Sequence, residues 1–154
     1  MPAGGYLEEL RRAVGQRALI VPGACVAIRD HAGRVLLHRR TDDGSWDLIG
    51  GSMEPGETFE QTARREVREE IGVELGDLEP LEVYSGPAFF HTYPTGDEVY
   101  HVGVAFQTRD MRGEFRLDPG EVAELEFFAL DALPGPLQRG ARHHLEEIKR
   151  RELR

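Results

Sequence analysis

The spacing of apolar residues along the chain predicts three helices. From Thr58 to Ile71 apolar side chains return every four positions, and Gly72 follows where a helix would end. Spacings of three and four residues also predict a short amphipathic helix over about 5–14 and a final one over about 139–153. The recurring apolar positions are Phe59, Ala63, Val67 and Ile71 in the middle helix, and Leu145, Ile148 and Leu153, expected to face the core, in the last.

Continuous apolar runs between these helices predict β-strands. The runs 18–28 and 34–40 flank a loop around Gly33 and predict a β-hairpin. Further strands are expected at 81–85, 99–108 and 124–129. Strands and helices in this order predict an α/β (α+β) fold in which helices flank a mixed sheet. Nothing repeats at a fixed period and no linker is evident, so we expect one domain over 1–154.

Composition narrows the class of protein. The chain has 154 residues, with 28 Asp+Glu against 19 Lys+Arg and a net charge of -9, which argues against a nucleic acid polymer as a partner. The single cysteine, Cys25, lies in an apolar run and is expected to be a small core residue of an intracellular protein. With no run of about 18 apolar residues and no secretion signal at the start of the sequence, we expect a cytoplasmic protein that does not contact membranes.

Three carboxylates of the middle helix form the first candidate site. Glu66, Glu69 and Glu70 are related by i, i+3 and i+4, so they project from one side of the helix. Like charges in this arrangement repel by about a few tenths of a kcal/mol per pair. A bound Mg²⁺ or Mn²⁺ would reverse that sign, because these cations prefer oxygen ligands. The alternative is a solvated helix face with local ion pairs.

A glycine-rich turn precedes this helix. Gly50, Gly51 and Gly56 let the backbone approach a ligand closely. Arg65 is placed to orient neighbouring carboxylates, including Glu57, through charge-assisted hydrogen bonds. The loop and the helix together predict a site for a metal–phosphate complex in which a metal-activated water is the nucleophile.

These residues resemble the complete signature of the Nudix hydrolase superfamily. Gly51, Glu57 and the run 65–73 match its defining positions, so that the signature spans 51–73. One departure is Ile49, where many relatives have a proline before the two glycines. The resemblance implies an α/β/α sandwich around a mixed sheet, with Mg²⁺ or Mn²⁺ bound by a loop–helix–loop.

The resemblance also implies a reaction and a set of roles. The reaction is hydrolysis of a nucleoside diphosphate linked to another moiety, by in-line attack of water at phosphorus. The implied metal ligands are the carbonyl of Gly51 and the side chains of Glu66, Glu69 and Glu70. Glu57 would lie beside the metal and pair with Arg65. The general base stays open among Glu70, Glu69 and an acidic residue of a later loop.

Other candidates lie outside the signature. Glu121 resembles a loop glutamate that completes the metal site in some relatives; the alternative is an exposed loop residue. Phe90 and Tyr93 belong to an aromatic group near a turn and could stack on a base, at about 1–3 kcal/mol per stacked base, or simply pack. Arg40, at the end of a predicted strand, is a candidate for binding substrate phosphate, against a solvated strand end.

Several readings of function stay open. The first is a pyrophosphohydrolase of small nucleotides, either nucleotide sugars such as ADP-ribose or normal and oxidised nucleoside triphosphates. The second is a nucleotide-sensing module of the same fold without turnover, which loss of a signature carboxylate would favour; all are present here. A messenger-cap decapping enzyme would carry a basic RNA-binding extension, which is not evident. By analogy with the family, the N-terminal helix could support a homodimer.

Overall fold

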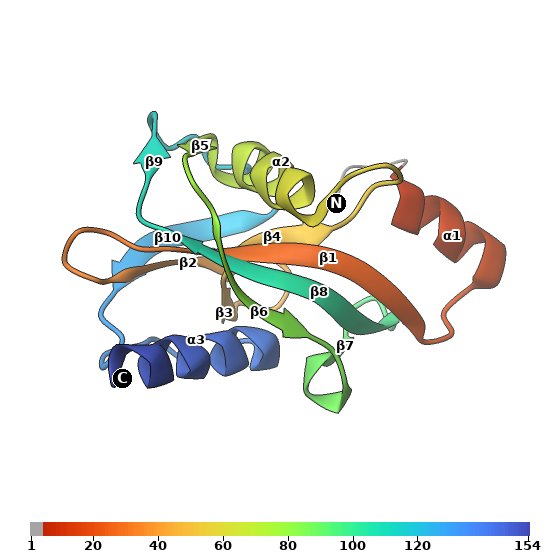
Figure 1. Ribbon diagram of the computed structural model, residues 1–154. Helices are drawn as coiled ribbons and strands as arrows, with labels where there is room; N and C mark the ends of the chain where they lie inside the picture. The colour runs from red at the N-terminus through yellow and green to blue at the C-terminus, as the bar shows by residue number, and fades with distance from the viewer. Residues whose placement is uncertain (1–4) are drawn as a thin grey trace.

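Two β-sheets lie between helices in the computed structural model, which describes residues 5–154 (Figure 1). The helices are α1 (Tyr6–Val14), α2 (Phe59–Ile71) and α3 (Arg139–Glu152), with a short 3-10 helix η1 (Pro87–Phe89). The longer strands are β1 (Leu19–Ile28), β2 (Val35–Arg40), β4 (Ile49–Ser52), β6 (Glu79–Tyr84), β8 (Glu98–Thr108) and β10 (Val122–Phe128). The shorter strands are β3 (Trp46–Asp47), β5 (Glu74–Leu75), β7 (Phe90–Thr92) and β9 (Met111–Arg112). Helix α2 covers one side of the sheets and α3 the other, which confirms the expected α/β/α sandwich (Figure 1).

The strands are divided between a mixed sheet and an antiparallel sheet. The mixed sheet has the order β4-β1-β8-β6, with β7 also paired to β8. In this sheet β1 runs parallel to β8, and the other pairs are antiparallel. The second sheet has the order β10-β2-β3 and is antiparallel throughout. A two-stranded pair of β5 and β9 lies beside them.

The predicted hairpin between the first two strands is wrong. Strand β1 belongs to the mixed sheet and β2 to the antiparallel one, and they share only an isolated bridge between Arg29 and Val35. The reason is that β1 is apolar on both of its faces and occupies the centre of its sheet. Its two edges are taken by β4 and β8, so no edge remains for β2. The turn at Gly33 therefore carries the chain from one sheet to the other.

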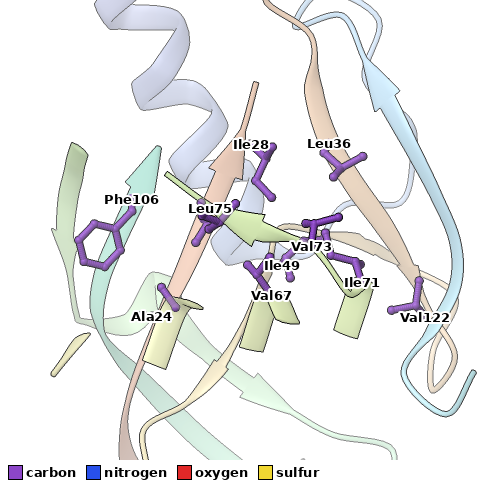
Figure 2. Packing of buried hydrophobic residues seen from close by; sticks show 12 residues of the cluster. Ala24, Ile28, Leu36, Ile49, Val67, Ile71, Val73, Leu75, Phe106 and Val122 are labelled. Carbon is purple, nitrogen blue, oxygen red and sulfur yellow. The ribbon is translucent and has the colours of Figure 1, made fainter. Parts of the chain in front are cut away.

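Two apolar clusters hold the layers together. On the α2 side, Val67 and Ile71 are fully buried against β1, β2 and β4 (Figure 2). On the α3 side, Leu145 and Ile148 pack against the opposite faces of the sheets. Leu153 was expected to face the core, yet it is 88% exposed, because it follows the last helical residue.

Both ends of α2 are fixed by local contacts. The Thr58 hydroxyl accepts the Gln61 backbone N–H at 3.1 Å, and the Gln61 side chain accepts that of Thr58 at 2.8 Å, forming a capping box. At the other end Gly72 has a φ of 78°, a left-handed conformation that favours glycine, and its N–H bonds to the Arg68 carbonyl. The predicted helix is confirmed, although Phe59 at its start is 36% exposed because it lies in the first turn.

Helix α1 lies against one end of the molecule (Figure 1). It confirms the short helix predicted over 5–14, and every residue in it is at least partly exposed. The Arg11 guanidinium holds it in place by donating to the carbonyls of Arg17 and Glu98, each at 2.6 Å. Residues 1–4 of the expected single domain lie outside the described residues. Over 5–154, the helices are too short or too polar to traverse a lipid bilayer.

Candidate active site

A cleft of ≈ 650 Å³ brings together residues from both sheets and from all three helices. One group of lining residues is formed by β4, by α2 and by the loop before β10: Gly50, Gly51, Ser52, Glu66, Glu70 and Glu121. A second group comes from the strand ends and η1: Arg40, Asp47, Phe89, Phe90, Tyr93 and His101. The first group is acidic and the second is largely aromatic.

The carboxylates of α2 differ in their exposure. Glu66 and Glu70 are 3% and 7% exposed and line the cleft. Glu69 is not among the residues that line the cleft, and 42% of its side chain is exposed. At Gly51 an added Cβ would lie 2.4 Å from the carboxyl carbon of Glu66, so only glycine lets β4 pass this close to the helix. Two of the three helix carboxylates expected to converge therefore meet inside the cleft.

The buried carboxylates fit a divalent cation. Burial raises the pKa of Glu70 well above its usual value, and the charges of Glu66 and Glu121 raise it further. The pKa of Glu66 is also raised by burial, against the opposing effect of Arg65. Oxygen Oε2 of Glu70 is buried and has no hydrogen-bond partner among the described residues. Hard divalent cations bind to closely spaced, negatively charged carboxylate oxygens whose hydrogen-bonding capacity is not used up.

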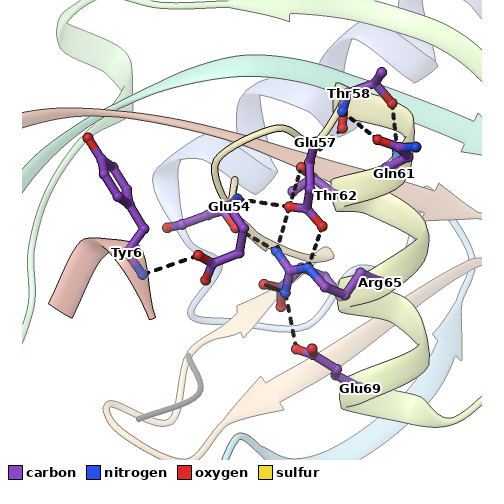
Figure 3. A network of polar contacts seen from close by, with 10 residues as sticks. Tyr6, Glu54, Glu57, Thr58, Gln61, Thr62, Arg65 and Glu69 are labelled. Carbon is purple, nitrogen blue, oxygen red and sulfur yellow. Dashed lines mark hydrogen bonds and ion pairs between the residues drawn. The ribbon is translucent and has the colours of Figure 1, made fainter. Parts of the chain in front are cut away.

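Arg65 connects these carboxylates to the glycine-rich loop (Figure 3). Its Nε and Nη2 donate to the two oxygens of Glu57 at 2.6 and 3.0 Å. Its Nη1 donates to Glu66 at 3.0 Å and to Glu69 at 3.2 Å, and Nη2 also reaches the Ser52 carbonyl at 2.9 Å. The bidentate pair with Arg65 holds the pKa of Glu57 at about 2. The guanidinium thus lies where the sequence predicted an orienting group.

Backbone contacts to the end of α2 bring Glu121 to the cluster. The Asp118 N–H donates to the Glu70 carbonyl at 2.9 Å, and the Arg116 N–H donates to that of Ile71 at 2.9 Å. This loop then turns, with the Glu121 N–H bonded to the Asp118 carbonyl at 3.1 Å, and leads into β10. Glu121 therefore faces the same cleft as Glu70, although about fifty residues separate them in the sequence.

The candidate substrate-binding residues also lie in the cleft. The Arg40 guanidinium is 5.7 Å from the ring centre of Tyr93, within the range of a cation–π contact. The Tyr93 hydroxyl lies 3.1 Å from Nε2 of His101, which fixes the tyrosine ring. Phe90 packs on Tyr100 at 4.9 Å between ring centres. All three candidates, Arg40, Tyr93 and Phe90, line the cleft.

Two features of the cleft were not anticipated from the sequence. Asp47 lines it beside Arg40, whose Nη1 is 3.4 Å away, and burial raises the pKa of Asp47 to about 6 against the effect of this partner. A polar residue between the buried Trp46 and Leu48 is the signal that could have identified it. Cys25, expected in the core, packs on the α3-side cluster but is only half-buried, and it lines the cleft as well.

Comparison with known proteins identifies the family of this fold and site. A family model for the NUDIX domain matches residues 19–149. The chain therefore belongs to the Nudix hydrolase family. A crystal structure of a MutT NUDIX hydrolase from Burkholderia pseudomallei has a TM-score of 0.72 at 31% identity, and the match covers 84% of this chain and 98% of that one.

Two curated relatives show how similar the chain is to known members. It is 36% identical over 117 residues to the NAD-capped RNA hydrolase NudC of Pseudomonas aeruginosa, covering 74% of this chain and 38% of NudC. It is 31% identical over 112 residues to the nucleoside triphosphatase NudI of Escherichia coli, covering 67% of this chain and 75% of NudI. The matched segment thus spans well under half of the NudC length and three quarters of NudI.

Proposed function

We propose that the protein is a pyrophosphohydrolase that requires Mg²⁺ or Mn²⁺ and cleaves the diphosphate linkage of a small nucleotide. The observation that carries this proposal is the cluster of Glu66, Glu70 and Glu121 in one cleft with Arg40 and Tyr93, in which Oε2 of Glu70 has no hydrogen-bond partner within residues 5–154. A carboxylate cluster suits a cation with its phosphate ligands, and the aromatic group suits a base or sugar.

The cation would be held by the Gly51 carbonyl and by four carboxylates: Glu66, Glu69, Glu70 and Glu121. When bound, it would neutralise charge on the phosphate oxygens and favour the attack of water at phosphorus. Glu57 does not line the cleft; through Arg65 it holds Glu66 and Glu69 in position. Glu70 and Glu121 line the cleft and can take the proton of the attacking water, whereas Glu69 does not line the cleft and is 42% exposed.

The other lining residues would hold the remainder of the nucleotide. Tyr93 and Phe90 offer ring faces to a base, and Arg40 offers a cation to a phosphate, although Asp42 and Asp47 already share its charge. The name of NudI, a nucleoside triphosphatase, supports a small nucleotide as the substrate, whereas NudC is named for a capped RNA. Nucleotide sugars and nucleoside triphosphates are both consistent with the cleft. A cytoplasmic location and a homodimer stay predictions.

The test is a phosphate-release screen of the purified protein with Mg²⁺ or Mn²⁺. The panel contains nucleotide sugars, dinucleoside polyphosphates, and normal and oxidised nucleoside triphosphates. We expect turnover of one class, and a loss of about 10²-fold or more in Glu70→Gln and in Glu69→Gln. Glu60→Gln is the matched control, because Glu60 lies on the same helix with its side chain 53% exposed and outside the cleft.

Two outcomes would contradict the proposal. Full activity of both Glu70→Gln and Glu69→Gln at saturating Mg²⁺ would remove the assigned metal site. No turnover of any compound, with nucleotide binding still detected by thermal shift, would favour the sensing module. The complete set of signature carboxylates argues against that alternative.

A further inference from the structure

A second group of metal-binding side chains lies where β6 meets α3, apart from the carboxylates of α2. Oε1 of Glu82 is 2.7 Å from Nδ1 of His144 and 3.2 Å from Nδ1 of His143. The three atoms all lie within 4.8 Å of one another. Ligands around one tetrahedral cation, each about 2.0–2.2 Å from it, lie about 3.3–3.6 Å apart, between the shortest separation in this group and its upper bound. One carboxylate oxygen and two imidazole nitrogens therefore already converge.

Strand β6 is distorted in a way that turns Glu82 inward. Its pairing with β8 shifts in register between Pro80 and Glu82, and such a bulge re-aims a side chain. As a result, the Glu82 side chain is only 17% exposed and faces α3, while the neighbouring apolar Val83 is 81% exposed. Burial of apolar surface alone favours the opposite orientation of these two residues. A local conflict of this kind is typical of a functional position.

Aromatic packing fixes both imidazole rings. Phe89 stacks on His144 with 5.3 Å between ring centres and meets the His143 ring edge-on at 5.0 Å. Tyr84 also contacts His144, edge-on with 4.9 Å between ring centres, and itself packs on Phe89 at 5.0 Å. The side chain of His144 is 4% exposed, whereas that of His143 is 45% exposed. The ring orientations are therefore set before a ligand arrives, and the His143 side leaves an entry path from solvent.

We propose that Glu82, His143 and His144 form a second metal site, which binds a borderline transition-metal cation of the Zn²⁺ type. Two imidazoles and one carboxylate suit Zn²⁺ and its neighbours, whereas Mg²⁺ prefers oxygen ligands alone. Three protein ligands leave a fourth position for water. Because His144 and Phe89 also line the catalytic cleft, a cation here would lock α3 and β6 together behind the cleft wall. This inference does not depend on the proposed nucleotide substrate.

Calorimetry of the full chain with ZnCl₂ tests the site in excess Mg²⁺, which is added to occupy the metal site proposed on the carboxylates of α2. The variants are His143→Ala and Glu82→Gln, and His31→Ala is the matched control because it removes an exposed imidazole elsewhere. We expect the wild type and His31→Ala to bind one Zn²⁺ that both site variants lose. That Zn²⁺ should raise the Tm of the wild type by several degrees and leave that of His143→Ala unchanged.

Nitrogen NMR of the histidine rings gives a readout independent of stability. Zn²⁺ should shift Nδ1 of His143 and His144 to values of a metal-bound nitrogen. The exposure of the His143 side chain makes a folding defect in His143→Ala unexpected, and its Tm without metal checks this. The proposal is overturned if the wild type binds no Zn²⁺ in excess Mg²⁺, or if either site variant binds it as the wild type does. The three side chains would then form only a hydrogen-bonded cluster.

Discussion

At the scale of single residues, Arg65 determines how the carboxylates of the site are arranged. Isolated ion pairs on a protein surface contribute about 0–1 kcal/mol, because solvent screens them. The pair of Arg65 with Glu57 differs, since it is bidentate and both side chains are at most 20% exposed. Glu57 also accepts the backbone N–H of Glu54 at 2.8 Å and the hydroxyl of Thr62 at 3.1 Å. The loop and the helix are therefore joined through one carboxylate.

Glu57→Gln should accordingly destabilise the protein by about 1.5–3 kcal/mol, the range for hydrogen bonds to charged groups. Urea unfolding measures the change. Glu60→Gln is the matched control, because its 3.7 Å pair with Arg64 is exposed and should contribute less than about 1 kcal/mol. Equal losses in the two variants would show that the pair with Arg65 is no stronger than a surface ion pair. The stabilisation from Glu57 should be complete above pH 4.5 and decline as the pH falls towards 2, the lowered pKa of this group.

At the scale of elements, α2 is the part of the fold that presents the site. Its inner face packs in the apolar core through Ala63, Val67 and Ile71. Glu66 lies one residue before Val67, and Glu70 lies three residues after it. Because the helix is pinned by its core face, its rotation about its own axis is fixed, and so is the direction of the carboxylates. In the first turn the apolar residue Phe59 is exposed, so the start of the helix relies on the capping box.

Thr58→Ala removes the side-chain cap and should cost about 1 kcal/mol of stability. Hydrogen exchange should show the loss in the first turn of α2, while the turn that carries Glu70 keeps its protection. Thr58→Asp is the matched control, because aspartate retains a capping oxygen and its charge favours a helix N-terminus. A Thr58→Asp variant as unstable as Thr58→Ala would indicate that the threonine methyl group, and not the cap, provides the stabilisation.

At the scale of the whole molecule, the cleft contains half-buried ionisable groups with opposite responses to pH. Burial lowers the pKa of His101 to about 4 and raises that of Asp47 to about 6. The unfolded chain binds a proton at the histidine more readily than the folded protein does, so His101 reduces stability as the pH falls from 6.5 towards 4. For Asp47 the folded protein binds the proton more readily, so the buried charge reduces stability as the pH rises from 3.8 through 6.

Two substitutions should separate these contributions. Relative to the wild type, His101→Gln should gain stability on acidification, whereas Asp47→Asn should gain it as the pH rises through 6. Urea unfolding at a series of pH values measures both differences, and His31→Gln, at an exposed position, should follow the wild-type curve. If the difference in unfolding free energy between His101→Gln and the wild type does not change with pH, the folded protein does not hold His101 as a neutral imidazole.

The amino-acid sequence by itself determined the parts of this protein whose contacts are local. The span of α2, its cap at Thr58 and its stop at Gly72 follow from residue types within a few positions of one another. The pairing of Arg65 with Glu57 bridges eight residues and could be predicted for the same reason. A side-chain period fixes which face of an element is apolar, so the buried faces of α2 and α3 were also predictable.

The tertiary structure alone decided which elements became partners. The apolar sequence of β1 is compatible with a hairpin to β2. In the structure, however, β4 and β8 pair with the two edges of β1. Convergence of Glu121, Arg40 and Tyr93 on one cleft likewise depends on pairings across long stretches of chain. The cluster of Glu82 with His143 and His144 joins a strand and a helix about sixty residues apart. Local periodicity carries no information on such pairings, because they are chosen by how whole faces and edges are covered.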